Sequence, residues 1–108
     1  MEYIQVMTTI DEREAAENIA HTLVSKRLAA CVQVVGPISS TYWWQNKVEH
    51  TEEWLCIIKT KRSLYKKLEA TIKQLHTYEV PEILAIPVAD GYEGYIKWLE
   101  EYLKLSQG

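Results

Sequence analysis

The chain has 108 residues, the length of a single domain, since domains cluster at about 100–150 residues. Hydrophobic residues make up 47% and charged residues 25%, which is typical of a folded chain rather than a disordered one. The net charge of −3 is not the basic balance of a chain that binds nucleic acid or an anionic membrane, so neither is an expected partner, while local basic patches stay open. We therefore expect one folded domain over residues 1–108.

The sequence also indicates where the protein is found. No apolar stretch reaches the ~20 residues that a membrane span needs. The first residues lack the basic and long apolar regions of a signal peptide, so we expect a cytoplasmic protein. Two cysteines, Cys31 and Cys56, are too few for a disulfide framework.

The first part of the chain predicts a strand followed by a helix. Apolar and polar side chains alternate over residues 2–9, as in a half-buried strand. Asp11 is the predicted N-cap of the helix, and Glu14 stands three residues later, where a capping box places an acid. The apolar stripe of this helix consists of Ala16, Ile19, Ala20, Leu23 and Val24.

Two long strands are predicted next, over residues 29–44 and 47–60. They are joined by a tight turn at Gln45-Asn46, because asparagine tolerates the left-handed backbone that such a turn requires. Gly36-Pro37 interrupts the first of them and predicts a bulge or bend.

A two-residue turn also sets which residues face each other in the hairpin. Cys31 would oppose Thr60, and Cys56 would oppose Val35. The two cysteines are then roughly 13 Å apart along the strand. Because a disulfide allows only about 7 Å between Cα atoms, we expect free thiols.

The rest of the chain predicts a helix over residues 62–76, an irregular segment over 77–82, a short strand over 83–88 and a last helix over 92–105. The irregular segment follows from Val80, since a residue before proline disfavours helix. Pro87 places the short strand at an edge or a bulge. The apolar stripe of the last helix consists of Tyr92, Tyr95, Ile96, Leu99, Tyr102 and Leu103.

The predicted order, β-α-β-β-α-β with a terminal helix, is the ferredoxin-like split βαβ arrangement, an α+β fold. Its sheet is antiparallel, with both main helices on one face. The other face should then be polar, but Val34-Val35, Trp54-Leu55 and Ile57-Ile58 place apolar groups on both faces. An uncovered apolar face marks an interaction surface, so we expect a homo-oligomer. The alternative is a lone domain with an adhesive face.

These residues resemble the CutA divalent-cation tolerance proteins. The resemblance covers nearly the whole chain and rests on several separate motifs in the right order. The motifs are Lys26-Arg27-Leu28-Ala29-Ala30-Cys31-Val32, Tyr42-Trp43-Trp44, Leu55-Cys56-Ile57-Ile58-Lys59-Thr60, His76-Thr77-Tyr78-Glu79-Val80-Pro81-Glu82-Ile83 and Tyr95-Ile96-Lys97-Trp98-Leu99. The resemblance implies a homotrimer whose sheets pack around a threefold axis. It also implies a role in tolerance of copper and other divalent metals, and no enzyme activity.

The predicted metal ligands are His76, Glu82 and Met7. Imidazole and carboxylate suit copper, zinc or nickel, and the thioether of Met7 suits copper(I). Some metal-binding members of the family have a cysteine at the position of Met7 and a histidine at that of Leu75, so His76 alone remains of that site. The alternative for His76 is a helix C-terminus, where an imidazolium interacts favourably with the helix dipole.

Two further groups of residues are candidates for binding. Lys59, Tyr78 and Glu79 would line a cleft between subunits, although Lys59 alternatively forms a structural ion pair. Trp43, Trp44 and Trp54 are expected to be interface anchors and hairpin packing rather than a ligand cage.

Five functions can be compared against these residues. The first is a trimeric protein that binds copper or another divalent cation. The alternatives are a small-molecule sensor similar in fold to PII-type signalling proteins, and a structural trimeric scaffold. An acylphosphatase-type enzyme needs a loop with glycine and arginine after the first strand, which Thr8-Thr9-Ile10-Asp11 lacks. An RNA-recognition domain conflicts with Glu49, Glu52 and Glu53 beside Trp54.

Overall fold

The computed structural model describes residues 2–103. The elements follow the predicted order, with a 3-10 turn at Arg62–Leu64 before the second helix. They are β1 (Tyr3–Ile10), α1 (Arg13–Ser25), β2 (Cys31–Trp44), β3 (Lys47–Lys61), α2 (Tyr65–Leu75), β4 (Leu84–Pro87) and α3 (Glu93–Tyr102). Residues 104 and 105, which were predicted to end the last helix, lie outside the described residues.

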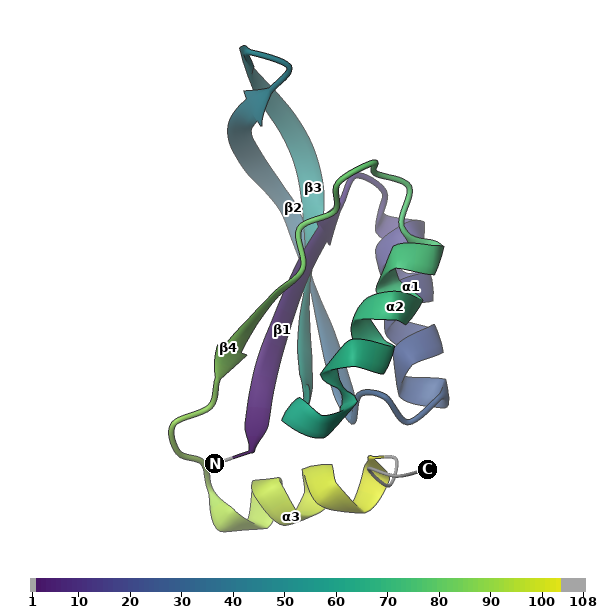
Figure 1. Cartoon of the computed structure of the whole chain (residues 1–108), viewed down its shortest axis with the longest axis vertical. Helices are drawn as coiled ribbons and strands as arrows, with labels where there is room; N and C mark the ends of the chain where they lie inside the picture. Colours follow the sequence, from purple (N-terminus) through teal and green to yellow (C-terminus); the bar gives the residue numbers. More distant parts are fainter. Residues whose placement is uncertain (1, 104–108) are drawn as a thin grey trace.

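The four strands form one sheet in the order β2-β3-β1-β4, and every neighbouring pair is antiparallel. The strand that contains Pro87 lies at an edge, as predicted. Figure 1 shows α1 and α2 together on one side of the sheet and α3 across its lower end. The hairpin of β2 and β3 extends well beyond the rest of the sheet (Figure 1).

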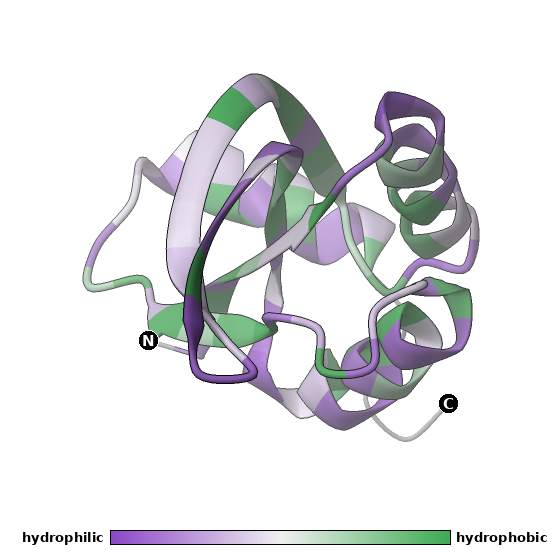
Figure 2. Ribbon diagram, turned by 90° about the horizontal axis from the view of Figure 1, so that it is seen from above, coloured by the Kyte–Doolittle hydropathy of each residue, from purple (hydrophilic) through white to green (hydrophobic). Residues whose placement is uncertain are grey.

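The hydrophobic core lies between the sheet and the two main helices. One face of β1 and β3 supplies Ile4, Val6, Ile10 and Ile58, which are all buried. Viewed from above, the helices carry both hydrophobic and hydrophilic stretches, as amphipathic helices do (Figure 2). The helices contribute Ala16, Ile19, Leu23, Leu68 and Ile72 to the core.

The last helix uses only part of its predicted apolar stripe. Leu99 and Leu103 are buried against the core and Ile96 is half-buried, whereas its tyrosines are exposed. Because α3 crosses the end of the sheet, only its inner side meets the core.

The hairpin register confirms the predicted turn and locates the bulge. Gln45 and Asn46 have φ values of 49° and 64°, as a two-residue turn requires. The register shifts between Val35 and Ile38, where Gly36-Pro37 lies.

The shift corrects the predicted pairs of both cysteines by one residue. Cys31 faces Lys59 instead of Thr60, and Cys56 faces Val34 instead of Val35. Both thiols are free, as predicted.

The predicted N-cap of the first helix is wrong. The N-cap is Glu12, which has an extended backbone and makes no side-chain capping hydrogen bond. Since β1 continues to the fully buried Ile10, Asp11 is taken up by the turn from strand to helix.

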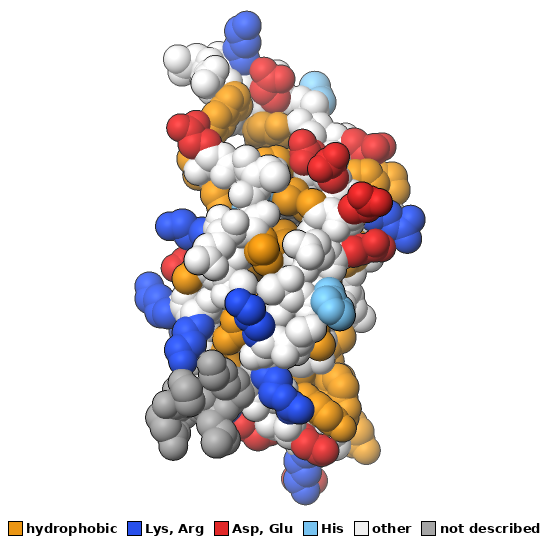
Figure 3. Space-filling model, turned by 90° about the vertical axis from the view of Figure 1, so that its right-hand side faces the viewer, with side chains coloured by type: hydrophobic (Ala, Val, Ile, Leu, Met, Phe, Trp, Pro, Cys, Tyr) orange, Lys and Arg blue, Asp and Glu red, His pale blue; other side chains and the backbone are white. Residues whose placement is uncertain are grey.

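The sheet face that points away from the helices keeps apolar side chains, as its sequence pattern indicated. Met7 pairs with Ile57 on one side and Leu84 on the other, and Leu84 is 57% exposed. Val35 and Ile86 are exposed as well. The opposite side of the molecule differs, since charged side chains are spread over it (Figure 3).

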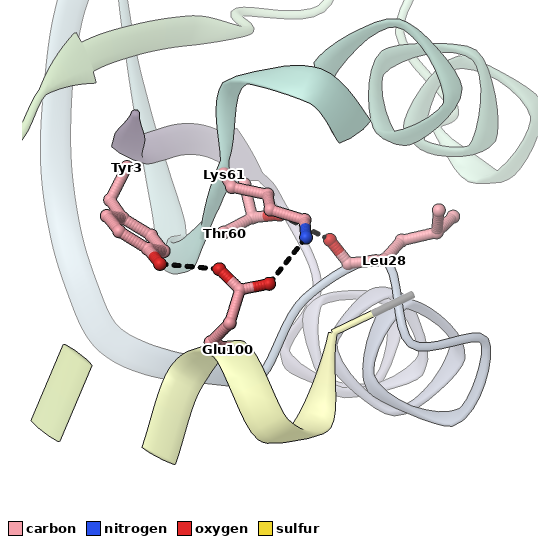
Figure 4. A network of polar contacts seen from close by, with 5 residues as sticks. All are labelled: Tyr3, Leu28, Thr60, Lys61 and Glu100. Atoms are coloured by element: carbon pink, nitrogen blue, oxygen red, sulfur yellow. Dashed lines mark hydrogen bonds and ion pairs between the residues drawn. The ribbon is translucent and has the colours of Figure 1, made fainter. Parts of the chain in front are cut away.

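Glu100 attaches α3 to the sheet through both of its carboxylate oxygens (Figure 4). The Tyr3 hydroxyl donates to Oε1, and the Lys61 ammonium lies 2.6 Å from Oε2. The hydrogen bonds from Lys61 and Tyr3 lower the pKa of Glu100. The bond to Glu100, together with burial, raises the pKa of Tyr3 to about 12. Beside them, the Thr60 hydroxyl donates to the Leu28 carbonyl at 2.7 Å.

Glu100→Gln should lower the free energy of unfolding by about 0.5–1 kcal/mol at neutral pH, the upper part of the range for ion pairs near the surface, since the Glu100 side chain is 48% exposed and that of Lys61 13%. Because the folded-state pKa of Glu100 is lowered, its contribution is present above the unfolded pKa of about 4.3 and is lost as pH falls through the folded pKa. Urea unfolding at neutral pH and at about pH 3 should show the difference shrinking in acid. Glu101→Gln, an exposed neighbour, is the control. A difference independent of pH would contradict this role.

Candidate functional site

A cavity of about 700 Å³ lies along the extended hairpin, from Glu53 near its base to Trp44 next to its tip. Its walls come from the hairpin, the end of β1 and the segment after α2, which passes beside the hairpin in Figure 1. Among the described residues, no lysine, arginine or histidine lines it. The aromatic and acidic residues of its wall are Tyr42, Trp43, Trp44, Tyr78, Glu53, Glu79 and Glu82.

Local sequence explains why these two segments meet. The bulge at Gly36-Pro37 lies where the extended part of the hairpin begins. On the other side, α2 ends with His76 in an extended conformation, and Pro81 prevents the following residues from continuing a helix. Residues 77–82 therefore run as an irregular segment along the hairpin.

Glu53 and Tyr78 form a buried pair at the cavity. Glu53 is 4% exposed, and its Oε2 accepts a hydrogen bond of 2.6 Å from the Tyr78 hydroxyl. Burial, and then the bond to Glu53, raise the pKa of Tyr78 far above its usual value, so the phenol stays a neutral donor. Within residues 2–103, no cationic side chain forms an ion pair with Glu53. A buried carboxylate with one neutral donor is costly, which favours a cation beside it.

His76 holds Tyr78 in place through two hydrogen bonds to the backbone. The Tyr78 amide donates to Nδ1 at 3.1 Å, so Nε2 carries the ring proton and donates to the Thr9 carbonyl at 2.7 Å. The imidazole also meets the Tyr78 ring edge-on, with centroids 4.6 Å apart. Both ring nitrogens are therefore occupied, and the ring joins the segment after α2 to the end of β1.

The structure does not gather the three predicted metal ligands. Glu82 lines the cavity, whereas His76 lies behind Tyr78 and does not line it. Met7 is half-buried on the open face of the sheet. Among the described residues there is no group of three or more His, Cys, Asp or Glu side chains arranged to hold a metal ion.

The predicted cleft residues are also separated. Tyr78 and Glu79 line the cavity, but Lys59 lies on the open face and donates to the Gln33 side chain at 2.9 Å. Its partner is thus an amide rather than the acid of the predicted structural ion pair.

The three tryptophans differ in their surroundings. Trp43 is 73% exposed and, with Trp44, lies next to the tip of the hairpin. Trp54 is half-buried and packs on the core and against Gly36.

Sequence reasoning missed Glu53 as a site residue. Glu49, Glu52 and Glu53 look alike in the sequence. Only the contact with Tyr78, 25 residues further along the chain, distinguishes Glu53 from the others. The alternation of the strand separates only Glu52, because Glu49 and Glu53 both share a face with Leu55.

The fold and its long hairpin define a known class of small α+β protein. The solved structure of the divalent cation tolerance protein (Cut A1) from Thermus thermophilus matches with a TM-score of 0.92 and 41% identity. The match covers 94% of this chain and 99% of that one. The family model described as CutA1 divalent ion tolerance protein matches residues 4–102. The chain belongs to this family, which is named for ion tolerance rather than for a reaction.

Curated relatives agree with this assignment. The divalent-cation tolerance protein CutA of Thermus thermophilus is 44% identical over 96 residues, which are 89% of this chain and 93% of the relative. Protein CutA 1, chloroplastic, of Oryza sativa is 42% identical over 103 residues, which are 95% of this chain. This chain spans 58% of the rice protein's length. No helix within the described residues is long and apolar enough to cross a membrane.

Proposed function

We propose that the chain forms a homotrimer of ferredoxin-like subunits that binds a divalent cation at the acidic cavity beside its hairpin. The observation that carries this proposal is Glu53, a carboxylate that is 4% exposed and has a single neutral hydrogen-bond donor. The family's name for divalent ion tolerance supports the same class of ligand. We propose no catalytic activity. The two free thiols suit the reducing cytoplasm as its compartment.

The uncovered sheet face supports the homotrimer. Leu84, Ile86 and Val35 are exposed apolar side chains on one face of a sheet whose other face is covered by helices. Burying that face against other copies would remove apolar surface from water at about 25 cal/mol per Å².

The cavity offers oxygen ligands to the cation. Glu53 would supply the buried carboxylate, and Glu79 and Glu82 the outer ones. Because one chain holds no complete ligand cluster among its described residues, the remaining ligands would come from water or from a neighbouring copy. Copper(II) is the strongest binder of the divalent first-row series, so it is the ion we propose to test. The second candidate for copper is the set predicted from the sequence, His76, Glu82 and Met7.

The test is copper(II) affinity by chelator competition on the full chain, with light scattering to measure the assembly's mass. Glu53→Gln should weaken binding at least tenfold, since even residues behind a metal ligand contribute about 10–100-fold. Glu52→Gln, its exposed neighbour, is the matched control and should bind like wild type.

The two proposed ligand sets give different results with His76→Gln. The amide can still donate to the Thr9 carbonyl but is a poor metal ligand, so affinity should persist if the cation binds at the cavity. If His76→Gln loses copper binding and Glu53→Gln keeps it, the site would instead consist of His76, Glu82 and Met7. A trimer that binds no copper would overturn the proposed metal function, and a monomer mass would overturn the proposed assembly.

A further inference from the structure

The cavity is far larger than a metal ion requires. Its volume of about 700 Å³ falls within the roughly 300–1,000 Å³ of small-molecule sites. Such sites are mostly apolar, with a few polar groups that fix the orientation of the ligand. Here the polar groups include three carboxylates, and no basic side chain of the described residues offsets their charge. The charge of the wall therefore selects a cationic ligand.

The buried carboxylate has room for donors from a ligand. Oε2 of Glu53 accepts the Tyr78 hydroxyl, whereas no residue within 2–103 hydrogen-bonds to Oε1. A carboxylate has about four lone-pair positions and accepts two parallel N–H bonds from one planar cation. Tyr78 is fixed in turn by His76, so the acceptor is held before a ligand arrives.

The aromatic part of the wall suits the flat face of such a cation. Trp44 and Tyr42 both line the cavity and keep about 40% of their surface exposed. The hydroxyl of Tyr42 shares a hydrogen bond of 2.6 Å with that of Thr51, which restrains the ring. The face of a tyrosine ring attracts a cation, and a guanidinium also stacks on an aromatic ring as a plane.

We propose that this cavity binds small guanidinium compounds, with the guanidinium on the Glu53 carboxylate and its plane against Tyr42, whose hydroxyl meets Thr51 two residues before Glu53 in β3. The planar fork of donors distinguishes this class from a simple ammonium, which presents a point charge. The inference goes beyond the proposed metal site, because it needs the cavity but no metal ion. Since both ligands use Glu53, copper(II) and a guanidinium compound should compete.

The experiment compares butylguanidinium with butylurea, a neutral compound of nearly the same shape. Calorimetry on the full chain, freed of metal by a chelator and dialysis, should give at least about tenfold tighter binding for the cation. Glu53→Gln should remove that preference, and Glu52→Gln should keep it. Tyr42→Leu should weaken binding about 3–30-fold, whereas Tyr42→Phe, which keeps an aromatic face, should lose less.

Two results would overturn the inference. One is equal affinity for butylguanidinium and butylurea, and the other is no binding of either compound. The metal proposal is tested separately, by the copper(II) affinity measured in chelator competition. Binding of butylguanidinium without any binding of copper would remove the metal function and leave this inference standing, while the reverse result would remove the inference alone.

Discussion

Tyr78→Phe should lower the free energy of unfolding by about 2–3 kcal/mol. The variant keeps the ring but removes the only hydrogen-bond donor that Glu53 has among the described residues. A buried acceptor left unsatisfied costs about 1–3 kcal/mol, and a charged one lies at the upper end. Urea unfolding at one fixed protein concentration measures the loss, because stability depends on concentration wherever copies assemble.

Repeating Tyr78→Phe in the Glu53→Gln variant separates the hydrogen bond between Tyr78 and Glu53 from the packing of the Tyr78 ring. In Glu53→Gln the acceptor is neutral, so adding Tyr78→Phe should cost only about 1 kcal/mol, the net worth of an ordinary hydrogen bond. An equal loss in both backgrounds would show that Glu53 does not depend on the phenol.

The stability of the protein at alkaline pH gives an independent test of the hydrogen bond from Tyr78. Its folded-state pKa is raised, so its contribution is fully present below the unfolded pKa of about 10 and is lost as pH rises above it. Tyr78→Phe should remove that part of the decline.

The sequence predicted the elements well wherever a local pattern decides them. The turn at Gln45-Asn46 and the bulge at Gly36-Pro37 were both predicted, because backbone preferences of single residues fix them. The N-cap at Asp11 failed for a tertiary reason, since burial of Ile10 extends the strand to the edge of the helix.

The candidate site was predictable only in part. Tyr78, Glu79 and Glu82 were singled out from one segment of sequence, and all three line the cavity. The buried acid comes from β3, and its role depends on a contact made across the fold. His76 was predicted as a ligand because of its residue type, whereas its two backbone hydrogen bonds follow from how α2 ends beside β1.

Gly36→Ala should destabilise the protein by about 2–3 kcal/mol, the usual cost of forcing extra volume into a packed region. A Cβ at Gly36 would lie 2.4 Å from Cδ1 and 2.8 Å from Cγ of the Trp54 side chain. Trp54 packs on the core, so its ring cannot move aside freely. Glycine is needed at this position because a side chain would not fit, and not because of backbone conformation, since the φ of Gly36 is not positive.

Gly94→Ala is the matched control. A Cβ there would also approach an aromatic ring, but Tyr92 is 80% exposed and can turn into solvent. Gly94 lies in α3, where alanine is the better helix former by about 1 kcal/mol. Gly94→Ala should therefore be neutral or slightly stabilising in the same unfolding experiment.

The pair of Gly36 and Trp54 also bears on the cavity, because Trp54 directly follows Glu53 in β3. A displaced Trp54 would move the strand that carries the buried carboxylate, so Gly36→Ala should weaken cation binding as well as folding. Gly36→Ala should cost less in a Trp54→Leu background than in wild type, since the smaller side chain leaves room for the new Cβ. If Gly36→Ala cost the same with Trp54 or Leu at that position, the contact would not be the reason for glycine in the bulge.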